Sequence, residues 1–298
     1  MKVFRFVSAL CLLLALSVCS QAFADGGTPK PFGCVGAAFG PAGTGFPVGK
    51  FAAVVNYMFA ETDGVRLNDD EINDNVKLTK HVGIIKFRYG IAPGLDVRTA
   101  TPVYDVDADL PGGQTAHYGW LGDTTVVLHK VVMNQGKGNP FSLAFDIGVV
   151  LPTADGGRDN NNFTGNQAWG AGAGVGLTYF LGANRLDQEF NYYTFSEAED
   201  NYRKPDRFRC YTGWAHALSK SFDIGAESNF EWNGESETFD QSQDDARREW
   251  YVGPKMVFKH QKSGTVLGAL FTLPVYRDYD SPCPSDGYRF ELKLVKVF

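Results

Sequence analysis

Cysteine is scarce in this chain of 298 residues. Cys11 and Cys19 lie close to the N-terminus, and Cys34, Cys210 and Cys283 are spread over the remainder. Three distant cysteines without a C-x-x-C spacing support neither a disulfide framework nor a zinc site.

Catalytic signatures are also missing. The chain contains neither H-E-x-x-H nor G-x-S-x-G, and the histidines show no other zinc-binding spacing. These histidines are His81, His117, His129, His216 and His260. We therefore expect neither an enzyme nor a bound cofactor, and no metal site.

Long apolar runs are confined to the N-terminus. Lys2 and Arg5 precede an apolar stretch over residues 7–18, and Ala22-Phe23-Ala24 fits the small-x-small rule for signal peptidase. We predict a signal peptide over residues 1–24. The rest of the chain has no apolar run near the roughly 20 residues of a membrane-spanning helix.

Positive charge is in the minority. The precursor has 34 acidic and 28 basic residues, and loss of Lys2 and Arg5 with the leader leaves a net charge of −8. An exported acidic chain is poorly suited to neutralising phosphates, so we expect no nucleic-acid partner.

What the chain does contain is alternation of apolar and polar residues. Phe145, Ile147 and Val149 alternate with Asp146 and Gly148, and similar patterns recur throughout. We predict an all-β fold of about twelve strands, over residues 50–61, 76–89, 95–106, 119–132, 141–152, 167–181, 184–198, 207–218, 222–234, 246–259, 265–276 and 286–298.

Connection lengths separate a membrane barrel from a soluble sandwich. The predicted connections alternate between short ones rich in turn residues and long polar ones, such as residues 62–75 and 107–118. Outer-membrane barrels have short periplasmic turns, long outer loops and an even number of strands. We therefore predict an antiparallel transmembrane β-barrel over residues 50–298, located in the bacterial outer membrane.

The final strand supports this location. Tyr288, Phe290, Leu292 and Leu294 share one face, and the chain ends at Phe298. This resembles the C-terminal signature that the barrel-insertion machinery reads, with Lys296 as a departure. The expected partners are that machinery, outer-membrane lipid and lipopolysaccharide, and a small-molecule solute.

Three stretches resemble one known family. They are Gly119-Trp120-Leu121-Gly122-Asp123, Val149-Val150-Leu151-Pro152-Thr153 and the glycine-laced segment from Trp169 to Gly182. Together with the final strand they are similar to the outer-membrane transporter family named for the MetA pathway of phenol degradation. The resemblance implies movement of small, aromatic or hydrophobic compounds across the outer membrane.

The polar face of the strands supplies the lumen-lining candidates. They carry both signs of charge or lack a side chain: Lys86, Arg88, Asp96, Arg98, Asp146, Gly172, Gly174, Glu189, Arg209, Glu227, Glu231 and Lys255. Hairpin geometry places Arg88 near Asp96 and Arg209 near Glu231. Such pairs fit a charged constriction that selects solutes, or a salt-bridged filler.

Two regions concern the state of the lumen. Gly170, Gly172, Gly174 and Gly176 leave one face of a strand bare, which predicts a passage or an inserted segment beside it. The Gly/Pro-rich N-terminal segment, residues 25–49, is a candidate for that insertion, although disorder is the default for such a terminus.

These features favour a channel or facilitator for small organic molecules. The alternative is a structural or adhesive surface barrel with a filled lumen. Twelve strands lie between the filled barrels of eight and the aqueous channels of 16–18, so strand number does not decide between the two.

Overall fold

The computed structural model describes residues 30–298 apart from 38, 41, 74, 155–166 and 199–200. The predicted signal peptide and residues 25–29 lie outside the described residues. Within the described part of the chain, no helix is long and apolar enough to span a membrane.

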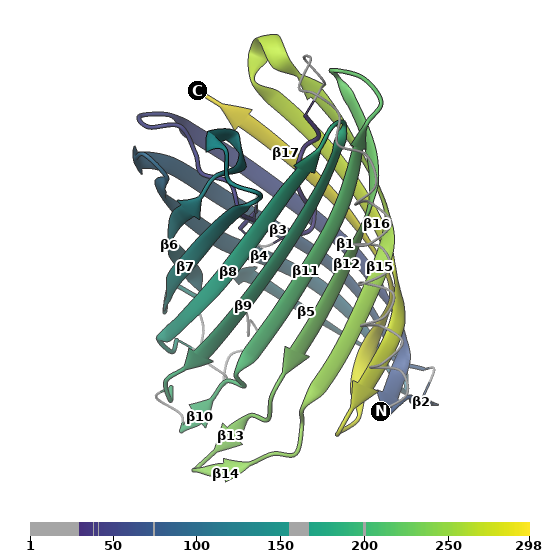
Figure 1. The fold of residues 1–298 in the computed structure, drawn as a ribbon. Helices are drawn as coiled ribbons and strands as arrows, with labels where there is room; N and C mark the ends of the chain where they lie inside the picture. The colour runs from purple at the N-terminus through teal and green to yellow at the C-terminus, as the bar shows by residue number, and fades with distance from the viewer. Residues whose placement is uncertain (1–29, 38, 41, 74, 155–166, 199–200) are drawn as a thin grey trace.

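Twelve antiparallel strands form a closed barrel (Figure 1). Around the barrel they are β1 (Phe51–Leu67), β3 (Lys77–Ala92), β4 (Leu95–Leu110), β6 (Thr124–Met133), β7 (Ser142–Leu151), β8 (Gly170–Leu181), β9 (Asn184–Phe195), β11 (Arg207–Ala217), β12 (Phe222–Asn233), β15 (Arg247–His260), β16 (Thr265–Tyr279) and β17 (Cys283–Val297). β17 pairs with β1, so the barrel has no free edge. The predicted fold class is confirmed.

The alternation separates two faces in the direction that a membrane requires. On β7, Ile147 is 69% exposed whereas Asp146 is 4% exposed, and Phe145 also faces outward. A soluble sandwich would bury the apolar set, because water on that face would oppose folding. Here the apolar set covers the outside and the charged set is enclosed, as in a transmembrane barrel.

Short connections gather at one end of the barrel, the short-turn end. The turn between β8 and β9 contains only two residues, and Gly182 adopts a φ of 55° there. The turns after β6 and β15 contain the 3₁₀ segments η1 (Gln135–Lys137) and η2 (Gln261–Ser263). In outer-membrane barrels this end faces the periplasm.

The opposite, long-loop end contains more strand than predicted. β1 continues to Leu67 and pairs with β2 (Asp70–Asn73), so residues 62–75 are not a simple loop. β4 likewise continues to Leu110 and pairs with β5 (Gln114–Leu121), within the predicted loop 107–118. Hairpins can project beyond a barrel because their backbone groups pair within the hairpin.

Smaller strands complete this end. β10 (Tyr202–Arg203), β13 (Glu237–Thr238) and β14 (Gln241–Ser242) form a separate three-stranded sheet. The predicted strand 119–132 is interrupted between β5 and β6, and both of these strands pair with β4.

The barrel closes close to the C-terminus. The amide of Phe298 donates to the carbonyl of Phe51 at 2.8 Å, and the two ring centroids are 6.0 Å apart. Lys296, the departure from the C-terminal signature, donates through Nζ to the carbonyl of Ser263 in the neighbouring turn. A charged side chain is accommodated there because it reaches a polar group at the rim.

Candidate functional site in the barrel lumen

The N-terminal segment occupies the lumen. We call its described residues within 30–49 the plug; they lie at the end of the barrel that carries the C-terminus (Figure 1, purple). Val35 is fully buried and packs against Val257 and Leu270 of the wall. The plug joins the barrel sheet only through an isolated bridge between Val48 and Gly90. It is therefore an insert and not a thirteenth strand.

Carboxylates of the wall accept hydrogen bonds from plug amides. Glu227 accepts from the amides of Val35 and Gly36, the latter at 2.8 Å. Asp223 accepts from the amide of Phe32 at 2.8 Å. Bonds to ionised acceptors are stronger than neutral ones, so these contacts are principal anchors of the plug.

Lysines of the wall bind plug carbonyls. Lys255 donates to Gly33 at 3.2 Å, and Lys293 donates to Cys34 at 2.8 Å. The remaining lysine contacts are Lys259 to Lys30 at 3.0 Å and Lys86 to Ala37 at 3.4 Å. Each of these bonds engages the backbone of the plug and not a plug side chain.

An arginine–aspartate cluster holds the other end of the plug. Asp96 is fully buried and lies between Arg88, at 2.8 Å, and Arg98, at 2.7 Å. Both arginines donate to the carbonyl of Thr44, at 2.8 Å and 3.3 Å, and Asp96 accepts from the amide of Phe46 at 3.1 Å. The predicted pairing of Arg88 with Asp96 is confirmed.

The other charged candidates bond to the wall itself. Asp146 bonds to His129 at 2.6 Å, and Glu189 accepts from Asn191 at 2.8 Å. Arg209 lies opposite Glu231 in the strand register, as predicted, with the charged groups 4.0 Å apart. Six of the ten charged candidates therefore bind the plug and the other four do not.

Sequence analysis missed other residues that bind the plug or one another in the lumen. Lys259 binds Lys30, and Arg185 is paired with Asp187 at 2.8 Å beneath Gly33. All three side chains lie on the period-2 polar faces of their strands. That signal could have identified them, although it does not say what they bind.

The glycine face of β8 is covered rather than empty. A Cβ atom on Gly172 would lie 2.6 Å from the ring of Tyr193 and from the carbonyl oxygen of Tyr192. A Cβ on Gly174 would meet the side chain of Asn191. Gly176 instead faces the plug, where the carbonyl of Ala42 approaches closely. Small residues are needed on this face because the backbone or a large side chain lies directly over it.

A pocket lies where the plug ends toward the long-loop side. It is lined by Phe39 of the plug and by Asn191, Tyr193, Arg207 and Arg209 of β9 and β11. Phe39 packs against the buried cluster that contains Tyr193. The pocket combines an aromatic floor with two cationic side chains.

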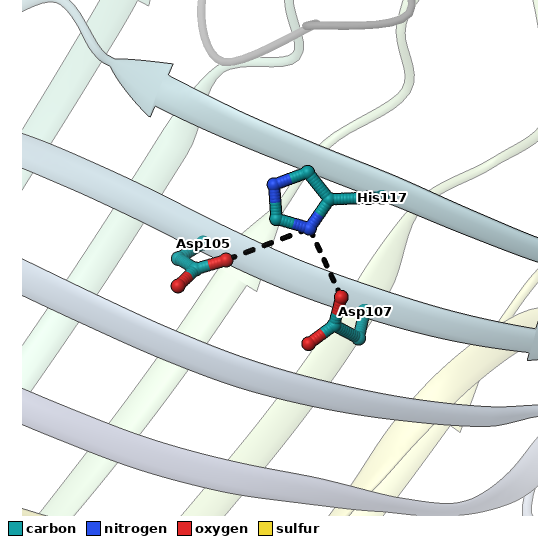
Figure 2. Close-up of side chains that lie close together, drawn as sticks. All are labelled: Asp105, Asp107 and His117. Carbon is teal, nitrogen blue, oxygen red and sulfur yellow. Dashed lines mark hydrogen bonds and ion pairs between the residues drawn. The ribbon is translucent and has the colours of Figure 1, made fainter.

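A separate cluster lies on the outer face of the β4–β5 hairpin (Figure 2). The Nδ1 atom of His117 lies 2.9 Å from Asp107 and 3.6 Å from Asp105. All three side chains are exposed, and they face away from the lumen. They are therefore not part of a path through the barrel.

Comparison with known proteins agrees with this architecture. The family described as putative MetA-pathway of phenol degradation matches residues 58–279. The chain belongs to this family. No curated protein matches its sequence.

Solved structures support the fold of this MetA-pathway family member. The COG4313 outer membrane channel from Pseudomonas putida F1 aligns with a TM-score of 0.74 and 18% identity, over 88% of this chain and 98% of that one. A FadL homologue from Pseudomonas aeruginosa aligns at 0.45 and 9%, over 91% and 99%. The first alignment shows the same twelve-stranded outer-membrane barrel fold; the second is too distant to support an argument.

Proposed function

We propose that this protein is an outer-membrane channel for small organic molecules that the plug closes at its short-turn end. The observation that carries the proposal is the way in which the plug is held. Charged side chains of the wall bind its backbone, and only one bridge joins it to the barrel sheet. Its departure would leave the hydrogen bonds between the barrel strands intact.

The plug is held firmly enough to be the resting state. Each hydrogen bond to a charged group contributes about 1.5–3 kcal/mol when its partner has no substitute. In an emptied lumen, however, water would replace the plug as the partner of Lys255, Lys293 and Glu227. The net free energy of seating is therefore much smaller than the sum of the contacts, and a modest perturbation can unseat the plug.

The competing function is a structural or adhesive surface barrel. The dense ion-pair network favours it, because the lumen around Glu227 and Asp96 is filled by charged groups with partners. On that hypothesis the plug is a permanent part of the core and never leaves. The two functions therefore differ in whether release of the plug opens a conducting path.

A disulfide between plug and wall distinguishes these functions. The Sγ atom of Cys34 lies directly over Gly213 of β11, at the place where a side chain on residue 213 would begin. Gly213→Cys, with Cys210→Ser and Cys283→Ser to remove the other thiols, allows an oxidised bond from Cys34 to lock the plug. We expect the oxidised protein in a planar bilayer to show no openings, and reduction to restore them.

The control is the same Cys210→Ser, Cys283→Ser protein with Gly213 retained, which should conduct under both conditions. Equal conductance of the locked and the reduced protein would mean that solute passes beside the plug. Absence of conductance from wild type and every variant would favour the structural barrel.

A further inference from the structure

Above the plug, the arginine pocket has the chemistry of an anion site. Arg207 and Arg209 are two positions apart on β11, so both side chains point to the lumen. Among the described residues, no carboxylate lies within ion-pair distance of Arg207. Arg209 has Glu231 as its partner only at 4.0 Å, and its Nε atom has no hydrogen-bond partner.

Aromatic rings surround the cation that lacks a carboxylate. The guanidinium carbon of Arg207 lies 5.8 Å from the ring centroid of Tyr193 and 5.7 Å from that of Phe195. Phe39 packs against the same two rings from the plug. A ligand here would meet flat apolar surfaces on its body and a guanidinium at one edge.

A further basic residue lies close to the pocket. Lys204 precedes β11, and its Nζ atom lies 5.4 Å from the ring centroid of Phe195. Its carboxylate partner, Asp123, is 3.6 Å away. Positive charges therefore outnumber the described carboxylates along this part of the wall, which attracts anions although the whole chain is acidic.

We propose that this pocket binds a small aromatic carboxylate on its way through the lumen. The planar fork of Arg207 can bind both oxygens of a carboxylate, which the point charge of a lysine cannot do. The ring of the ligand would pack against Tyr193 and Phe39. Because Phe39 belongs to the plug, the bound anion contacts both the wall and the element that closes the path.

This inference rests on the proposed function for its meaning but is tested by binding. Isothermal titration of the mature protein in detergent with benzoate should give saturable binding. Arg207→Gln should raise the dissociation constant at least about tenfold, which corresponds to 1.4 kcal/mol. Arg207→Lys should recover only part of the affinity, since the charge remains but the fork is lost.

Two controls isolate the pocket. Arg248→Gln removes the same charge from an arginine that pairs with Asp278 at 2.8 Å, and it should leave the affinity unchanged. Benzyl alcohol has the same ring without the carboxylate and should bind at least about tenfold more weakly than benzoate. Heat-modifiable migration in gels verifies that each variant forms a barrel.

Equal affinity of wild type and Arg207→Gln, or equal affinity for benzoate and benzyl alcohol, would overturn the inference even in a conducting channel. Absence of conductance together with Arg207-dependent benzoate binding would instead overturn the channel function and leave the binding site standing.

Discussion

Glu227 and Lys255 form an ion pair of 3.0 Å inside the lumen, and both side chains are almost fully enclosed. Each also binds the plug: Glu227 accepts from its amides, and Lys255 donates to the carbonyl of Gly33. The pair therefore couples β12, β15 and the N-terminal segment. Removing one partner leaves the other charge buried, which typically costs about 3–5 kcal/mol.

Glu227→Gln should unseat the plug without dissolving the barrel. The amides of Val35 and Gly36 lose their charged acceptor, and Lys255 gains stability only if water enters. We expect channel openings in a planar bilayer to become at least about tenfold more frequent, because loss of one charged hydrogen bond exceeds 1.4 kcal/mol. Glu61→Gln, at an exposed site bonded to Tyr288, is the matched control. Unchanged openings in Glu227→Gln would show that this pair does not control the plug.

Two glycines of β8 should respond differently to the same substitution. Gly176→Ala puts a methyl group against the carbonyl of Ala42, so it should displace the plug and increase conductance. Gly172→Ala puts the methyl group against Tyr193 and the β9 backbone, so it should destabilise the wall by about 1–3 kcal/mol. Urea unfolding in detergent and bilayer recordings measure the two effects. Identical effects of the two substitutions would contradict the different surroundings of these glycines.

Cys34 provides a chemical report on the position of the plug. Its side chain is buried, with 5% exposure, whereas Cys210 and Cys283 are partly exposed, and all three are free. In a Cys210→Ser, Cys283→Ser background, maleimide labelling of Cys34 should be slow and should accelerate about tenfold on adding Glu227→Gln. Rapid labelling in the background protein would show that the plug is open at rest.

His117 should titrate above its ordinary range. The hydrogen bond with Asp107 on the exposed hairpin raises the pKa of His117. A raised folded-state pKa means that this contact stabilises the hairpin below the unfolded pKa of about 6.5, and that the stabilisation is lost as pH rises through the folded pKa. Asp107→Asn should lower the pKa of His117 in an NMR titration, and added salt should diminish the difference. A pKa unaffected by Asp107→Asn would rule out the contact in solution.

Much of the fold could be read from local patterns. Alternation around Phe145 and Asp146 identified which side chains face out and which face in, because the period of a strand is two. Turn residues such as Gly182 marked the short-turn end. The extended hairpins at Leu67 and Leu110 escaped prediction, because polar residues in water favour loops and exposed strands alike.

The sequence by itself determined the barrel: closing twelve alternating strands is how such a pattern pairs its backbone in a membrane. It also identified the charges of the lumen, since Arg88, Asp96 and Glu227 lie on polar faces. Only the tertiary structure decided what those charges bind. Their partners are backbone groups of residues 30–49, and every residue carries the same amide and carbonyl, so no side-chain pattern records the contact. The location of the plug therefore followed from enclosure by the whole wall.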